Sequence, residues 1–257
     1  MNKKKNVLAI MLLTFVIIAG IKMKAVAEPN NIPLPNINIS VDEASSPKEY
    51  VGNIKLLIVL TVLTLLPSFL IMMTCFTRIA MVLSFFKSAI GAQQSIPSQV
   101  LIGLALFLTI FVMAPVYGEV NSKALMPYME NKITQEEAIE LGTKPIKEFM
   151  LKQTRKKDLE LFGELSGVEK GTLTRENIPL TTLVPAFAIS ELKTAFEIGF
   201  LIYLPFLVID MVVASVLMSM GMFMLPPAMV SLPFKLLLFV MVDGWHLLIK
   251  SLVQSFM

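Results

Sequence analysis

The chain has 257 residues, of which 55% are hydrophobic and only 16% are charged, and its formal net charge is +3. A soluble domain carries about 25% charged residues, so the composition excludes an ordinary soluble protein and predicts a membrane protein. No basic segment is interleaved with aromatic residues and no glycine-rich phosphate loop follows a strand pattern, which argues against a nucleic-acid partner.

Cysteine and histidine each occur once, as Cys75 and His246. They cannot form a disulfide framework, a Cys-based metal site or, without a second chain, a zinc site or a Ser-His-Asp triad. No metal, cofactor or catalytic residue is therefore expected.

Residues 1–27 have the composition of a signal peptide. Lys3, Lys4 and Lys5 precede an apolar core over 7–21, and Ala25-Val26-Ala27 supplies small residues for cleavage after Ala27. The alternative is an uncleaved anchor, since Lys22 and Lys24 follow the core. Residues 28–53 alternate proline with polar residues, which predicts a flexible, extended leader.

Residues 54–118 are predicted to form a first helical hairpin. The apolar run 56–77 is long enough to cross the roughly 30 Å hydrocarbon core, and Pro67 should kink it. Arg78 and Lys87 make the segment 78–98 cationic, which favours a cytoplasmic loop if the mature N-terminus is exported. The second apolar run covers 100–117 and is expected to close at Pro115.

Residues 119–178 are predicted to form a charged, non-cytoplasmic helical module. Thr134 and Glu137 have the spacing of a capping box. Pro145 is expected to open a second helix, in which Ile146, Phe149, Met150 and Gln153 share one face.

Residues 179–257 are again apolar, but prolines interrupt them. Pro205 is expected to divide a first hairpin between 185–204 and 205–220. A second hairpin should follow Pro226-Pro227, contain Pro233 and end at Gln254.

Six charged residues lie inside this apolar region. A charge in hydrocarbon costs from about 2.5 to over 10 kcal/mol, so such residues must face protein or water and are candidates for assembly or gating. Lys193 and Glu197 are four residues apart and can pair on one helix face. Glu191 needs another partner, for which Lys235, either within the chain or in a neighbouring copy, is the obvious candidate. A purely structural role remains open for all six residues: Glu191, Lys193, Glu197, Asp210, Lys235 and Asp243.

Methionines cluster just before Pro226-Pro227, at Met218, Met220, Met222 and Met224. Because methionine is flexible and polarizable, such side chains could seal an opening and still yield to objects of many shapes. The alternative is ordinary core packing.

Several long motifs resemble the FliP family, the P-type subunit of the flagellar type III secretion export gate. They are MMTCFTRI (72–79), GAQQSIP (91–97), GLALFLT (103–109) and nearly the whole of 185–245. The resemblance covers about 50–118 and 178–257.

The resemblance implies an all-α subunit of membrane-associated broken helices and helical hairpins. Several copies, five in the family, would assemble with Q-type and R-type subunits into a helical cone around a channel. The constriction falls on Met222, Phe223 and Met224 in GMFMLPP (221–227), where Phe223 replaces a frequent methionine and stiffens the plug. The implied buried polar contacts are Glu191, Asp210 and Lys235.

The predicted function is that of a non-enzymatic channel subunit in the bacterial cytoplasmic membrane and flagellar basal body. It would contact lipid and pass unfolded flagellar cargo outward. An injectisome gate differs only in cargo. A secondary transporter also suits broken helices with intramembrane acids, but its paired repeats are missing, and a membrane hydrolase lacks a nucleophile–base pair.

Overall fold

The computed structural model of this protein describes residues 47–93, 95–166 and 178–257, and every regular element within them is helical. This confirms the all-α prediction. The segment from Ile54 to Met257 forms one compact unit, and residues 1–53 form a separate one. The predicted signal peptide, the cleavage after Ala27 and most of the leader lie outside the described residues.

The first three described helices correct the predicted hairpin. Helix α2 (Pro47–Met72) continues through Pro67, and α4 (Ser98–Val120) continues through Pro115. Between them, the segment expected as a cationic loop forms helix α3 (Phe76–Ile90). Its apolar residues recur every three or four positions, which makes one face of a helix, and that face is buried: Ile79, Val82, Leu83, Phe86 and Ile90.

The described part of the charged segment, up to Ser166, consists of helices and short turns. A π-helical turn, η1 (Asn121–Leu125), leads from α4 into α5 (Met126–Met129). Helix α6 (Gln135–Gln153) starts at the predicted capping box of Thr134 and Glu137 and runs through Pro145 without a break. Helix α7 (Lys156–Leu165) follows.

The C-terminal region differs most from the predicted pair of hairpins. Helix α8 (Leu180–Ser219) is continuous over 40 residues and includes Pro185 and Pro205. The expected turn at Pro205 is therefore wrong, because a helix can lose one backbone hydrogen bond at proline and still propagate. Helices α9 (Pro227–Met241) and α10 (Gly244–Gln254) follow a loop and are bent by 67° where they meet.

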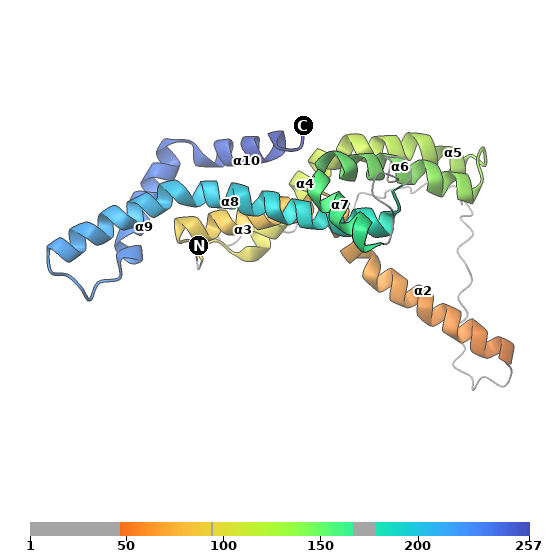
Figure 1. Cartoon of the computed structure of the whole chain (residues 1–257), viewed down its shortest axis with the longest axis horizontal. Helices are drawn as coiled ribbons and strands as arrows, with labels where there is room; N and C mark the ends of the chain where they lie inside the picture. Colours follow the sequence, from red (N-terminus) through yellow and green to blue (C-terminus); the bar gives the residue numbers. More distant parts are fainter. Residues whose placement is uncertain (1–46, 94, 167–177) are drawn as a thin grey trace, which may run out of the picture. The chain divides into compact units, whose positions relative to one another are not determined.

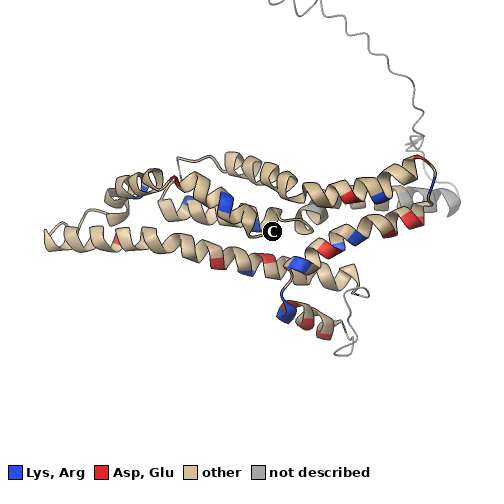
Figure 2. Cartoon of the chain, turned by 90° about the horizontal axis from the view of Figure 1, so that it is seen from above, with Lys and Arg blue, Asp and Glu red and all other residues tan. Residues whose placement is uncertain are grey.

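Helix α3 lies at the centre of the unit, where it packs against α4, α8 and α9. Helix α8 also contacts α6, α7 and α9. Figure 2, turned by 90° from Figure 1, shows the C-terminus between two rows of helices. The core around α3 joins Cys75 and Leu83 to Ala105 and Met113 of α4, Ala195 of α8 and Leu252 of α10.

Two helical segments are long and apolar enough to cross a membrane, namely Ser98–Met129 and Leu180–Ser219. The bent pair of α9 and α10 makes a third if it counts as one span. The shorter apolar stretch Leu56–Phe69 lies in α2. Membrane-spanning helices are thus present, and α2, α4 and α8 continue through the prolines that were expected to kink or end them.

The close approach of α3 and α8 depends on Gly199. A Cβ atom at this position would lie 2.4 Å from Cδ2 and 2.7 Å from Cγ of Phe85. We expect Gly199→Ala to lower the free energy of unfolding by about 1–3 kcal/mol, because the phenylalanine ring or the helix must shift. Thermal unfolding in detergent would measure this.

Gly103 of α4 provides the matched control, since a Cβ there meets nothing within 4 Å. Gly103→Ala should be neutral or stabilising, by up to about 1 kcal/mol, from helix propensity alone. Equal melting temperatures for the two variants would show that the contact with Phe85 does not constrain the packing.

Candidate functional site

The most buried charged site joins Arg78 of α3 to Glu191 of α8. Nε of Arg78 donates to Oε2 of Glu191 at 3.0 Å, and its Nη2 donates to Oε1. Both side chains are almost completely buried. The predicted Glu191–Lys235 pair is wrong within the chain, because Arg78 occupies both carboxylate oxygens. Sequence reasoning missed Arg78, which it had placed in a loop.

The remaining N–H groups of Arg78 hold the end of the chain. Its Nη1 donates to the carbonyl oxygen and to Oγ of Ser255, each at 3.1 Å. Its Nη2 also donates to Oε1 of Gln153, and its guanidinium lies 4.0 Å from the ring centre of Phe256. Arg78 thus links α3, α6, α8 and the segment after α10.

Two α6 side chains complete this arrangement, which we name the C-terminal clasp: Arg78, Lys152 and Gln153 around residues 255–257. Nε2 of Gln153 donates to the carbonyl of Phe256 at 3.1 Å, and Nζ of Lys152 donates to that of Met257 at 3.2 Å. Three consecutive carbonyls are therefore each bound by a different side chain. The clasp fixes the segment after α10 against α3 and α6.

A second charged site lies between α8 and α9, where Lys235 pairs with Asp210. Nζ of Lys235 donates to Oδ2 of Asp210 at 2.7 Å and to the carbonyl of Ala89 at 3.1 Å. Ser231 donates its hydroxyl to the other oxygen of Asp210. Lys235 is buried, whereas the Asp210 side chain keeps 33% of its exposure. The site ties α8, α9 and the end of α3 together.

This difference in burial predicts an asymmetry between the two partners. Asp210→Ala leaves a buried ammonium without a counterion, which should cost about 3–5 kcal/mol of folding free energy. Lys235→Met should cost less, about 1–3 kcal/mol, because the remaining carboxylate is only partly buried and keeps the hydrogen bond from Ser231.

Thermal unfolding in detergent of the two single variants and the double variant checks this. The double variant should lose about as much stability as Lys235→Met, because neither protein contains a buried ammonium without a counterion. A more severe loss from Lys235→Met than from Asp210→Ala would contradict the assigned burial.

The other predicted charges are exposed in the single chain. Lys193 and Glu197 form the expected i, i+4 pair on an exposed face of α8. Nζ of Lys193 lies 3.7 Å from Oε1 of Glu197. Asp243 lies at the bend before α10 with a left-handed backbone, φ 50°, and its side chain makes no capping hydrogen bond. None of the three is buried in the chain itself.

The methionine-rich segment forms the connection between α8 and α9, at one end of the unit (Figure 1). Gly221 has a left-handed φ of 76°, which turns the chain out of α8. The relative exposures are 41% for Met222, 77% for Phe223 and 98% for Met224. These side chains are therefore not core packing within the chain.

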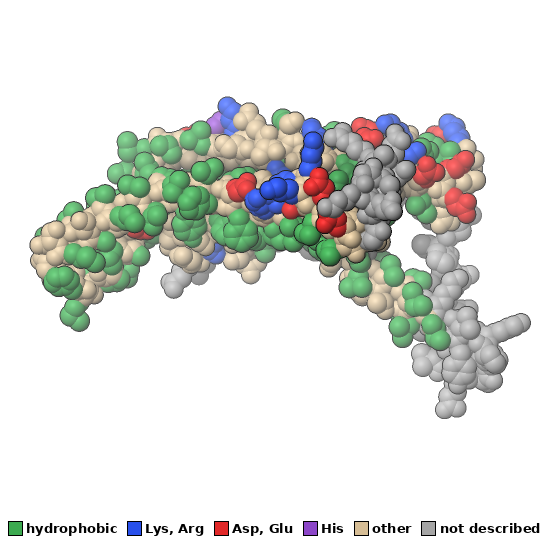
Figure 3. Space-filling model, in the orientation of Figure 1, with side chains coloured by type: hydrophobic (Ala, Val, Ile, Leu, Met, Phe, Trp, Pro, Cys, Tyr) green, Lys and Arg blue, Asp and Glu red, His purple; other side chains and the backbone are tan. Residues whose placement is uncertain are grey.

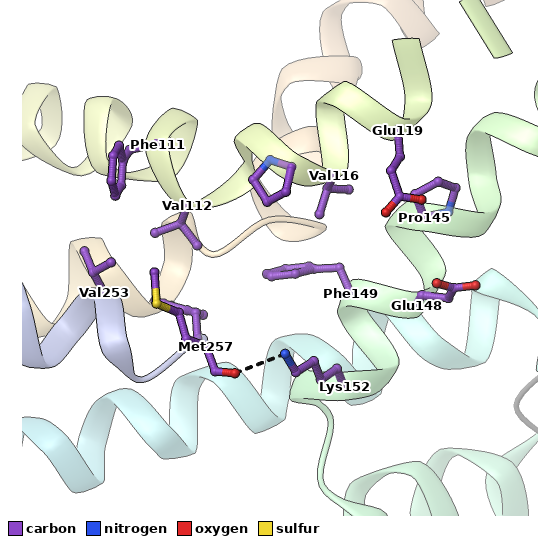
Figure 4. Close-up of a pocket in the computed structure, with 12 residues that line it drawn as sticks. Phe111, Val112, Val116, Glu119, Pro145, Glu148, Phe149, Lys152, Val253 and Met257 are labelled. Carbon is purple, nitrogen blue, oxygen red and sulfur yellow. Dashed lines mark hydrogen bonds between the residues drawn. The ribbon is translucent and has the colours of Figure 1, made fainter. Parts of the chain in front are cut away.

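A groove of about 540 Å³ lies between α4, α6 and the C-terminal segment (Figure 4). Its apolar lining includes Phe111, Val112, Phe149 and Val253. Glu119 and Glu148 lie at one end and Phe111 and Val253 at the other, and Lys152 reaches toward Met257 between them. No local sequence pattern predicts this groove, because its walls come from three distant segments.

Comparison with known proteins decides the family. Residues 59–252 match the FliP family. The chain is 60% identical over 218 residues to the flagellar biosynthetic protein FliP of Bacillus subtilis, which covers 85% of this chain and 98% of that protein. This chain belongs to the FliP family.

Other proteins named flagellar biosynthetic protein FliP agree. The one from Pectobacterium carotovorum is 54% identical over 204 residues, 79% of each chain. The one from Aquifex aeolicus is 49% identical over 224 residues, 87% of this chain and 92% of that protein. As a FliP-family protein, the chain is a non-enzymatic component of the flagellar type III export gate in the inner membrane. The transporter, hydrolase and injectisome alternatives are set aside.

Proposed function

We propose that several copies of this chain, five as the family resemblance implies, assemble with Q-type and R-type subunits around a channel for unfolded flagellar proteins. Met222, Phe223 and Met224 form the constriction of this channel. Energy for export comes from partner proteins, because the sequence contains no nucleotide-binding motif.

The observation that carries this proposal is the exposure of an apolar loop. Met222, Phe223 and Met224 project from the end of the α8–α9 pair and are exposed in the single chain. Neighbouring exposed apolar side chains of this kind mark a surface that contacts another protein or the membrane. Copies arranged in a ring would bring these loops together, and an apolar constriction bars water and ions by dewetting.

Native mass spectrometry of the full chain extracted in detergent tests the assembly, first alone and then with its co-expressed partners. A homo-oligomer alone and a larger complex with the partners are expected. A chain that remains monomeric in both samples would refute the proposed assembly.

A cysteine at Phe223 tests the place of the constriction. Loops that meet at a pore axis should bring Cα atoms within the roughly 4.4–6.8 Å that a disulfide requires, so oxidation of Phe223→Cys in membranes should yield linked dimers. The native Cys75 is fully buried and should not react. Met241→Cys, exposed on the far end of α9, is the control and should stay monomeric.

A further inference from the structure

The part of α8 that leads into the methionine-rich connection is apolar and exposed on two flanks. Its side toward α9 is marked by Phe206 and Leu217, which are buried, and by Asp210, which bonds Lys235. On one flank, long apolar side chains recur at intervals of three, four and seven residues and are all exposed. We name them the α8 ridge: Leu204, Leu207, Met211 and Met218. Figure 3 shows hydrophobic side chains over much of this end of the unit.

A groove of about 470 Å³ follows the other flank of the same stretch, between α8 and α9. Every residue that lines this groove is apolar. We name it the valine groove, because Val208, Val212 and Val216 of α8 and Val230 of α9 line it together with Phe234. Valine keeps one strongly preferred side-chain rotamer in a helix, so the walls of the groove hold their shape.

The valine groove requires an apolar occupant. Asp210 is the single charged residue of the sequence between 201 and 219, and it bonds Lys235 of α9. A charged or strongly polar segment would therefore lose its hydration in the groove without gaining a partner. This leaves an apolar protein surface or a lipid acyl chain.

The position of the valine groove favours a protein surface from a second copy. The groove reaches Leu217, and the connection that carries Met222, Phe223 and Met224 starts directly after Ser219. In the proposed assembly these connections meet around the channel, so the adjoining parts of α8 and α9 in neighbouring copies lie side by side. The groove is thus continuous with the proposed constriction.

We infer that the α8 ridge of one copy docks into the valine groove of the next copy. The ridge offers long leucine and methionine side chains, and methionine in particular fills irregular gaps, whereas the groove offers short, stiff ones. The contact buries no unpaired charge, which would be costly. The inference rests on the proposed assembly and names a surface through which its copies touch.

The ridge and the groove lie at the same level along the chain, as a ring requires. Rotation about the channel axis changes neither the height of a residue along that axis nor its distance from it. The ridge covers 204–218 and the α8 wall of the groove covers 208–217, so rotation alone can bring them together.

One α8 helix can make both contacts at once. Met211 and Val212 are one residue apart and therefore about 100° apart around the helix, which places ridge and groove on different flanks. Each copy then uses its ridge on one neighbour and its groove on another. Such a heterologous contact can close a ring.

Cross-linking between two differently tagged full-length copies tests the contact. One copy carries Met211→Cys and the other Phe234→Cys, and both are expressed in the same membranes with the partner proteins. Asp210 bonds Ser231 and Lys235, which places Phe234 near the level of Met211. A short bis-maleimide is the suitable probe, because packed helices keep their axes about 8–10 Å apart, beyond the roughly 7 Å limit of a disulfide. We expect a cross-linked dimer that contains both tags.

Each variant expressed alone is the first control and should give no dimer, because a heterologous contact brings different residues together. Met129→Cys is the second control and should not link to Phe234→Cys, since Met129 is exposed on α5, at the opposite end of the unit (Figure 1). The inference is wrong if the mixed dimer is missing from an intact oligomer, if Met211→Cys links to itself, or if Phe234→Cys links to a partner protein instead.

Filling the groove gives an independent readout. Val212 is 57% exposed in the single chain, so Val212→Trp should leave the melting temperature in detergent nearly unchanged. It should reduce the oligomer seen by native mass spectrometry about tenfold, because the ridge of the next copy no longer fits. Adding Met211→Ala to the same chain makes room for the larger ring and should restore part of the oligomer.

The other outcomes overturn the inference or the assembly on which it rests. A double variant as weak as Val212→Trp alone would contradict the docking of the ridge. An unchanged oligomer that loses the mass of a bound lipid would assign the groove to an acyl chain instead. A wild-type chain that never oligomerises would overturn the proposed assembly itself, so the two failures are distinguishable.

Discussion

Replacing Met222, Phe223 and Met224 together with alanine is expected to make the membrane leak ions while the amount of assembled complex stays the same. All three side chains are exposed in the single chain, so their removal leaves no cavity in its core. At a pore constriction, however, the loss of side-chain volume opens a path that water can wet. The measurements are membrane conductance and complex yield on the same preparation.

The control removes a comparable side chain away from the loop. Met241 is exposed at the end of α9 far from this loop, so Met241→Ala should cause no leak. If the three residues were instead core packing, each deletion of a buried methionine would cost about 2–5 kcal/mol and lower the amount of folded protein. A tight membrane with less protein would mean that the constriction lies elsewhere.

Arg78→Ala is expected to cause the largest loss of stability of any single change considered in this chain. It leaves the fully buried Glu191 carboxylate without a partner, which should cost about 3–5 kcal/mol. It also removes the hydrogen bonds to Ser255 and Gln153. Since folded proteins are stable by only about 5–15 kcal/mol, little folded protein should be recovered from the membrane.

Two further variants separate the charge pair from general damage. The double change Arg78→Met and Glu191→Leu should be milder than Arg78→Ala, because no charge remains buried. Lys193→Ala removes a charge from an exposed pair and should change stability by at most about 1 kcal/mol. The readouts are the yield of monodisperse protein in detergent and its melting temperature. A stable Arg78→Ala protein would refute the role given to the clasp.

Residues 255–257 are held against α3 and α6 by the contacts of the clasp. The side chains of Arg78, Gln153 and Lys152 bind three consecutive carbonyls there, and Phe256 packs under the guanidinium. The same residues form a wall of the α4–α6 groove. Damage to the clasp should therefore disturb the groove.

Features that depend on neighbours in sequence were predictable. The capping box at Thr134, the i, i+4 pair of Lys193 and Glu197 and the all-helical class follow from local spacing and composition. The motifs at 72–79 and 91–97 indicated the FliP family for the same reason, since they need no knowledge of contacts.

Only the tertiary structure decided where helices end and which charges pair. Pro205 does not end α8, because packing against α3, α6 and α9 stabilises the helix beyond the bond that proline removes. Arg78 and Glu191 are 113 positions apart, and no periodicity links such residues. Lys235 could have paired with any of several acids until the packing of α9 on α8 brought it to Asp210. Sequence spacing fixes which residues share a helix face, whereas a buried charge takes the partner that the packed helices bring within hydrogen-bond distance.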